Sequence, residues 1–397
     1  MRRLSDAAHR LTGQKMFQIL AKAQELERQG KDILHFEIGD PDFETPKNIV
    51  RAAQASLARG ETHYTNSKGL LDLRQAAIEV TVRSRGFCPD PEQILVTPGA
   101  NTQIYYAIAC AVNPGEEVVI PDPGFVSYAS IVNFVGAVPV RIPLVEESEF
   151  RLNPADVEKA ITPRTRMIIM NSPSNPTGAV MTEEEIRQIY DIAYRHGVYI
   201  LSDEIYARMV YEDEYTKFIS PSKFDQCRDI TIVVNGFSKS YAMTGWRLGV
   251  VMGPVDIISK MGLLLETTTS CVSPFIQRAG IEALRGSQEK IVGMVQEFRR
   301  RRDMIVHGLN TLAGVRCLKP HGAFYVFPNI SGTGLTSEAF ADFLLSQAGI
   351  AVSPGTIFGE YGEGYVRLCY ANSAENIERG IDRMRVALAK SVNAGIR

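Results

Sequence analysis

A lysine and an arginine stand in an unusually apolar stretch, GFSKSYAMTGWRLG, at residues 236–249. Lys239 lies between two serines, and only small, hydroxyl, apolar or aromatic residues separate it from Arg247. A solvated surface pair is the ordinary alternative, but the ammonium of lysine is rarely buried without a partner or a purpose. The stretch therefore offers a candidate amine nucleophile and a candidate anion ligand.

Three further stretches combine turn residues with polar side chains. TPGANTQ at residues 97–103 is a glycine-containing turn that opens a helix, where free N–H groups and the helix dipole favour a phosphate. NSPSNPTG at 171–178 is a rigid loop that offers the amide of Asn175. In SDEIYARMVY at 202–211, Asp203 ends an apolar strand, which is a costly place for a carboxylate unless a cation pairs with it.

Each stretch taken alone also fits an ordinary structural role, as a turn or a surface pair. All four, however, follow predicted strands, and open α/β sheets bind ligands at the carboxyl ends of their strands. Together they supply an amine, a carboxylate, a helix start, an amide and a guanidinium. Pyridoxal phosphate needs this set, because its aldehyde takes a lysine and its pyridinium nitrogen takes an aspartate.

The elements that must position these groups alternate between strands and helices. Apolar runs predict strands, and the spacing of residues 182–197, with Thr182 and Glu185 as a capping box, predicts a helix. Such alternation predicts an α/β fold with a mostly parallel sheet covered by helices on both faces. The predicted strands are 116–120, 166–170, 198–203, 230–234 and 249–252.

The pattern changes after about residue 285. A long charged helix is predicted over 286–312, followed by short strands in VRCL, AFYVF and YVRLC around a helix at 336–349. This order predicts a smaller α+β domain, and we expect the helix at 14–30 to pack with it, which makes the small domain discontinuous. The predicted division is 1–45 for the N-terminal arm and part of the small domain, 46–290 for the large cofactor domain, and 291–397 for the small C-terminal domain.

Composition excludes several classes of function. The 397 residues carry a formal net charge of -2 and are 45% apolar, which is typical of a globular protein and gives no basic field for nucleic acid. No apolar run reaches membrane-spanning length. The six cysteines include no CxxC pair, so we expect reduced thiols, no metal site and a cytoplasmic protein.

The sequence resembles the fold-type I pyridoxal-phosphate enzymes, and specifically the class I/II aminotransferases related to aspartate aminotransferase. The resemblance runs nearly end to end, through IGDPDF, HYTNSKG, TPGAN, PDPGFVSY, NSPSNPTG, SDEIYARMVY, SKSYAMTGWRLG, GAFYVFP and YVRLCYANS in order. It implies a large domain with a mostly parallel seven-stranded sheet. It also implies ping-pong transfer of an amino group between an L-amino acid and a 2-oxo acid through a Schiff base, in a homodimer with shared active sites.

The resemblance also implies roles around the cofactor ring. Lys239 would form the Schiff base and move the proton between Cα and C4′, and Asp203 would pair with the pyridinium nitrogen. Asn175 and Tyr206 would bond the 3-oxygen of the ring, and Phe125 would cover its face. Lys239, Asp203 and Tyr206 are thus the candidate catalytic residues.

Other matched residues would hold the phosphate and the substrate. The phosphate would be bound by the backbone of the TPGAN turn, by two side chains after the fourth strand and by a tyrosine of the partner subunit: Ala100, Asn101, Ser238, Arg247 and Tyr64. Arg367 would clamp the substrate α-carboxylate in a bidentate manner, with Asn175 and the backbone of Gly39 beside it.

Two alternatives remain open. A lyase of the same fold, such as a C-S lyase or an aminocyclopropane-carboxylate synthase-like enzyme, shares the cofactor chemistry, but related C-S lyases tend to carry SDEIH where this chain has SDEIY. A cofactor-binding sensor domain of a transcription regulator would carry an N-terminal DNA-binding module, for which we expect too few residues before IGDPDF.

The preferred substrate depends on a position in the phosphate turn. One bacterial branch of aspartate aminotransferases has a lysine there that binds the distal carboxylate of the substrate, and this chain has Asn101. Because burial of an unpaired carboxylate is costly, we expect donors with neutral side chains. Lys15 is the rival cation, although a solvated position at the end of a helix is the simpler interpretation.

Overall fold

The computed structural model describes residues 3–212 and 216–393 and centres on a seven-stranded sheet of order β2-β8-β7-β6-β5-β3-β4. All neighbouring strands in it are parallel except the two pairs that β8 forms. The mostly parallel α/β sheet expected from the sequence is thus confirmed. The strands are β2 (Ile94–Thr97), β3 (Glu117–Asp122), β4 (Val138–Pro143), β5 (Thr165–Asn171), β6 (Tyr199–Asp203), β7 (Thr231–Gly236) and β8 (Gly249–Met252).

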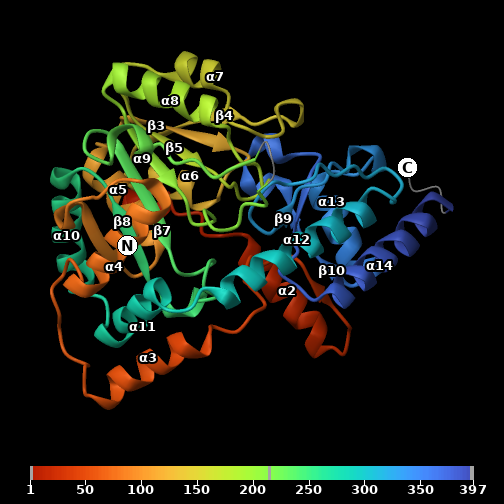
Figure 1. Ribbon diagram of the computed structural model, residues 1–397. Helices are drawn as coiled ribbons and strands as arrows, with labels where there is room; N and C mark the ends of the chain where they lie inside the picture. Colours follow the sequence, from red (N-terminus) through yellow and green to blue (C-terminus); the bar gives the residue numbers. More distant parts are fainter. Residues whose placement is uncertain (1–2, 213–215, 394–397) are drawn as a thin grey trace.

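Helices cover both faces of this sheet (Figure 1). Alternate residues of one strand point to opposite faces, so Val118 packs with one set of helices, which includes α5 and α10, while Val119 packs with α7 and α8 on the other face. Burial on both faces explains the continuous apolar runs of the inner strands. The helices of this domain are α3 (Lys47–Ala58), α4 (Leu71–Arg85), α5 (Ala100–Ala111), α6 (Ser127–Phe134), α7 (Pro154–Ala160), α8 (Glu183–His196), α9 (Ser222–Asp225), α10 (Val255–Thr269) and α11 (Pro274–Arg285).

Helix α8 begins where its sequence predicts. The Thr182 hydroxyl accepts a hydrogen bond from the Glu185 N–H at 3.2 Å, and the Glu185 carboxylate accepts one from the Thr182 N–H at 2.8 Å. The helix ends at Gly197, whose left-handed φ of 63° favours glycine. The capping box is therefore confirmed.

The smaller domain is built from both ends of the chain. In Figure 1, α2 lies beside the C-terminal elements, and β1 pairs in parallel with β10 through Leu34 and Ile350. A second sheet has the antiparallel order β11-β12-β9. This confirms a discontinuous α+β domain, made of α2 (Met16–Arg28), β1 (Leu34–His35), α12 (Glu289–Leu309), β9 (Tyr325–Val326), α13 (Ser337–Phe343), β10 (Ile350–Ala351), β11 (Ser353–Pro354), β12 (Val366–Cys369) and α14 (Ala374–Asn393). The first helix, α1 (Asp6–His9), lies instead against α6 of the large domain, where Arg10 donates to the Asn133 carbonyl at 2.7 Å.

The predicted strand VRCL is wrong. Residues 315–318 form only an isolated bridge between Arg316 and Asn329. The Asn310 side chain donates to the Cys317 carbonyl and accepts from its N–H, both at 2.9 Å, so a side chain satisfies the backbone groups that a neighbouring strand would have paired.

The predicted helix over 336–349 changes character along its length. It is α-helical over α13 and continues as a π-helical turn, Leu344–Ala348. Short 3₁₀ turns occupy Pro91–Gln93, Glu146–Ser148, Thr244–Trp246, Ser331–Thr333, Gly355–Phe358 and Glu360–Gly362.

Candidate active site

The four polar stretches meet in one cavity of about 330 Å³ at the carboxyl edge of the sheet. They follow β2, β5, β6 and β7 directly, so the parallel arrangement of these strands brings their ends together. The predicted residues that line the cavity are Gly39, Ala100, Asn101, Phe125, Asn175, Asp203, Tyr206, Ser238, Lys239, Arg247 and Arg367.

Lys239 crosses from the large domain toward the small one. Its Nζ donates to the Gly39 carbonyl at 2.5 Å and lies 5.8 Å from the centroid of the Phe324 ring. Burial lowers the pKa of Lys239 to about 8, against an opposing effect of the Asp40 carboxylate, which raises it. A substantial fraction of this amine is therefore neutral near neutral pH, as a nucleophile requires.

Asp203 ends β6 as a buried carboxylate with no cationic partner in the part of the chain that the structure describes. Its Oδ2 accepts a hydrogen bond from the Tyr128 hydroxyl at 2.6 Å and its Oδ1 accepts one from the Ile205 N–H at 3.2 Å. Burial raises the pKa of Asp203 to about 6, although both hydrogen bonds oppose that rise. A ligand cation beside Asp203 would offset the free-energy cost of burying its negative charge.

Arg367, on β12, is only 1% exposed, although a lone arginine in a strand is ordinarily expected at the surface. Nη1 donates to Asn175 Oδ1 at 3.0 Å, Nη2 donates to the Glu37 carbonyl, and Nε has no partner. The guanidinium lies 4.6 Å from the Tyr325 ring centroid. A buried arginine that lines a cavity with an unsatisfied N–H is a ready site for a carboxylate.

A hydroxyl pair closes the cavity between the domains. The hydroxyls of Tyr206 and Tyr325 lie 2.7 Å apart, and burial raises the pKa of both groups. Gly39 is required beside them, because a Cβ added there would lie 2.0 Å from the Tyr325 hydroxyl oxygen.

An anion-binding corner lies at the start of α5. No side chain caps this helix at Gly99, so the N–H groups of its first turn, at Ala100 and Asn101, face the cavity region. A Cβ at Gly99 would lie 2.5 Å from Arg247 Nη2, so glycine lets the guanidinium approach. Arg247 itself has a left-handed φ of 54° and, within the described residues, no carboxylate partner.

One predicted site residue, Tyr64, lies outside this cavity. Tyr64 is 85% exposed and does not line the cavity of its own chain.

The sequence analysis did not predict Tyr128, although this residue follows Phe125 at helical spacing in the PDPGFVSY motif. It also did not predict Tyr325 of the GAFYVFP motif. It also missed Asn171, whose Nδ2 donates to the carbonyls of Pro173 and Asp203 at 3.2 and 3.1 Å and so joins the ends of β5 and β6.

The sheet order and a cavity lined by both a lysine and a buried aspartate define an enzyme of the fold-type I class. The profile of the family "Aminotransferase class I and II" matches residues 31–384, and the chain belongs to this family. It is a transaminase that depends on pyridoxal phosphate. The related lyase activity is not favoured, because the relatives found are named aminotransferases.

Two curated relatives and one solved structure illustrate the similarity. The chain is 44% identical to an aspartate aminotransferase of Pyrococcus horikoshii, over 93% of this chain and 94% of that protein. It is 41% identical to aromatic-amino-acid aminotransferase 2 of Thermococcus litoralis, over 97% and 98%. The structure of Thermus thermophilus aspartate aminotransferase with maleate superposes with a TM-score of 0.93 at 36% identity, covering 98% of this chain and 100% of that one.

The cavity fits pyridoxal phosphate in its chemistry. A buried, unpaired carboxylate at Asp203 suits a protonated ring nitrogen, and the uncapped start of α5 beside Arg247 suits a phosphate. The lowered pKa of the Lys239 amine suits its attachment to an aldehyde.

The raised pKa of Asp203 predicts a stability gain on substitution. Folded cofactor-free protein holds this proton up to about pH 6, whereas the unfolded chain releases it near 3.8, so stability from this group is complete below about pH 4 and falls as pH rises through 6. At pH 8, cofactor-free Asp203→Asn should be more stable than wild type by up to about 3 kcal/mol. The difference should vanish at pH 4, and turnover of the holoenzyme should collapse.

Urea unfolding of both proteins at the two pH values measures this difference. Asp256→Asn serves as a control, because this aspartate is exposed and its replacement removes no buried charge, so it should give no comparable gain at pH 8. Equal stability of Asp203→Asn and wild type at pH 8 would contradict the assigned cost of burying the carboxylate.

Proposed function

We propose that this transaminase moves the amino group between L-amino acids with neutral, mostly apolar side chains and the corresponding 2-oxo acids. The observation that supports substrate binding is the buried Arg367, with its free Nε inside the cavity. Among the described residues, the basic side chains that line the cavity are Lys239, Arg247 and Arg367. Each has a task in this proposal, which leaves no cation for a second substrate carboxylate.

The wall toward the N-terminal helix supports the same substrate class. Met16, Phe17 and Ile38 line it together with the amide of Gln14. Lys15 instead lines a separate cavity beside Lys22. A neutral side chain is thus matched by apolar contacts worth about 25 cal/mol per Å² of area buried, whereas a distal carboxylate would remain unpaired.

Arg367 orients the substrate in this proposal. Its Nε–H and an Nη–H take the two oxygens of the α-carboxylate, and Asn175 holds the guanidinium plane from the side. Tyr325, stacked below, excludes water from that pair. The carboxylate is thereby fixed and the Cα–H bond is directed toward Lys239.

Lys239 acts first as the amine that carries the cofactor and then as the base. When not attached to the cofactor, its amine would act as the base that takes the proton from the substrate Cα, a role favoured by a pKa of about 8. Pyridoxal phosphate, when bound, supplies the aldehyde and a ring that accepts the electrons of the broken Cα–H bond. Asp203 keeps a proton on the ring nitrogen, and Tyr128 holds the carboxylate in position.

The start of α5, Ser238 and Arg247 would hold the phosphate of the cofactor. Phe125 would cover its ring, and Tyr206 and Asn175 would form hydrogen bonds to the ring oxygen. We further propose a homodimer, in which Tyr64 of each subunit completes the phosphate site of the other. Its 85% exposure supports this role, since a large aromatic side chain gains from burial against a partner.

We also assign the protein to the cytoplasm. All six cysteines are free thiols, which fits a reducing compartment. No helix among the residues described has the length and apolar character needed to cross a membrane.

Replacing Lys239 tests the assigned chemistry. Lys239→Ala should abolish transamination and the visible absorption of the lysine-bound cofactor, because no other described amine lines the cavity. Spectra and a coupled assay with 2-oxoglutarate measure both. The control Lys159→Ala removes an exposed lysine and should keep both properties. Retention of either property in Lys239→Ala would show that another group bears the chemistry.

The substrate class is tested by comparing donors. We expect kcat/KM for phenylalanine and methionine to exceed that for aspartate and glutamate by roughly tenfold or more, which corresponds to about 1.4 kcal/mol for one unpaired carboxylate. Lys15→Ala should preserve this order. A preference for aspartate that disappears in Lys15→Ala would instead assign the distal contact to Lys15.

The shared site is tested through Tyr64. Sedimentation at micromolar concentration should give a dimer of the 43.9 kDa chain. Tyr64→Phe should remain dimeric and release the cofactor about tenfold faster or more, since a hydrogen bond to a charged group is worth about 1.5–3 kcal/mol. An active monomer, or unchanged cofactor release, would refute the shared phosphate site.

A further inference from the structure

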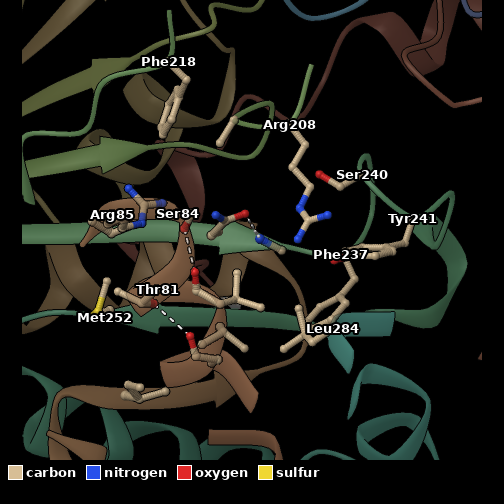
Figure 2. A pocket seen from close by; sticks show the side chains of 18 residues that line it. Thr81, Ser84, Arg85, Arg208, Phe218, Phe237, Ser240, Tyr241, Met252 and Leu284 are labelled. Atoms are coloured by element: carbon tan, nitrogen blue, oxygen red, sulfur yellow. Dashed lines mark hydrogen bonds between the residues drawn. The ribbon is translucent and has the colours of Figure 1, made fainter. Parts of the chain in front are cut away.

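A second cavity, of about 320 Å³, is lined in part by Phe237, Ser240 and Tyr241, which flank Lys239 in the sequence (Figure 2). It is bounded by α4, by β7 and β8, and by residues 236–241. Most of its wall is apolar: Ala77, Val80, Ile94, Phe218, Val233, Phe237, Val250, Met252 and Leu284. Its interior therefore favours an apolar body over bulk water.

Arg208 brings a positive charge to this cavity without a carboxylate to neutralise it. Its Nη1 donates to the Gln288 amide oxygen at 2.6 Å, and its guanidinium lies 5.2 Å from the centroid of the Tyr241 ring. Within the described residues, Arg208 has no ion pair and makes no other side-chain hydrogen bond. The remaining N–H groups of Arg208 are thus free to bind an anion.

Arg85 enters the same space with an unused donor. Its side chain is only 10% exposed, and Nη2 pairs with the buried Glu204 at 2.5 Å. Nη1 has no partner, and the guanidinium lies 5.5 Å from the Phe218 ring centroid. Glu204 neutralises the charge of Arg85 and does not itself line the cavity, so the lining keeps the net positive charge of Arg208.

We propose that this cavity is a second binding site, for a small carboxylate with an aromatic or branched apolar body. Figure 2 shows Arg85 and Arg208 on two sides of the same space, with Phe218 above and Leu284 below. The carboxylate takes the free N–H groups of Arg208, and the apolar body lies against α4, β7 and β8 on the side of Arg85 and Phe218. Arg208 has no carboxylate partner within the described residues, so an anionic ligand supplies the opposite charge that this side chain lacks.

The two cavities share one segment of chain. Phe237 and Ser240 line the second cavity, and their neighbours Ser238 and Lys239 line the active-site cavity. An occupant of the second cavity therefore packs against the reverse side of the lysine segment, separate from Arg367.

Calorimetry with 3-phenylpropionate on the holoenzyme tests this proposal. The probe has a carboxylate and an aromatic body but no amino or oxo group, so it cannot react. We expect two binding events per chain, of which Arg367→Ala removes only the active-site event. Arg208→Gln should weaken the other event at least tenfold and leave kcat/KM within about twofold. A single event that disappears in Arg367→Ala, or equal affinity in Arg208→Gln, would overturn the proposal.

Two further variants and two further probe molecules separate the contributions of charge and of apolar contact to binding. Ala77→Leu fills the cavity from α4 and should weaken the same event, independently of charge. Arg187→Gln is the matched control, because Arg187 also lies over an aromatic ring, 4.6 Å from the Phe224 centroid, but lines neither cavity. Acetate and 3-phenylpropanol should each bind at least tenfold more weakly at this site. Binding of acetate as tight as that of 3-phenylpropionate would contradict the apolar part of the site.

Discussion

Two buried charges of opposite sign, held apart in one cavity, are the constraint on which the structure depends. Asp203 and Arg367 are 4% and 1% exposed, and neither forms an ion pair within the described residues. Burial of unpaired charges is costly, so the rest of the fold must provide the stability that tolerates them. The sheet with both faces buried, and the core clusters against it, provide that stability. The cavity is consequently prepared for a ligand that brings the missing opposite charges.

The active site belongs to neither domain alone. Hydrogen bonds from Lys239 to Gly39, from Arg367 to Asn175, and between Tyr206 and Tyr325 all join the two domains. Below them, Tyr206 packs in the same hydrophobic cluster as residues of α12 and β12. Because binding groups lie on both sides, small shifts between the domains change the distance between the lysine and the carboxylate clamp. This arrangement links substrate binding directly to the packing of the domains.

The segment from β7 to β8 serves two environments. One of its faces carries Lys239 and Arg247 into the active site, while the other contributes Phe237 and Tyr241 to a mainly apolar cavity. Two backbone hydrogen bonds stabilise this segment: the Tyr241 N–H donates to the Phe237 carbonyl, and the Met243 N–H donates to the Ser238 carbonyl.

The sequence alone determined the inner strands of the large sheet, the helix α8 and the edge at which Lys239, Asp203 and Asn175 lie, because apolar runs, caps and turns act over a few residues. It failed where contacts join distant residues. The bond from Tyr128 to Asp203 spans 75 positions, and that between the Tyr206 and Tyr325 hydroxyls spans 119. VRCL is predicted as a strand, but the Asn310 side chain, seven positions earlier, pairs with the backbone N–H and carbonyl of Cys317. Burial, pKa values and the second cavity arise from packing between distant segments, so only the tertiary structure decided them.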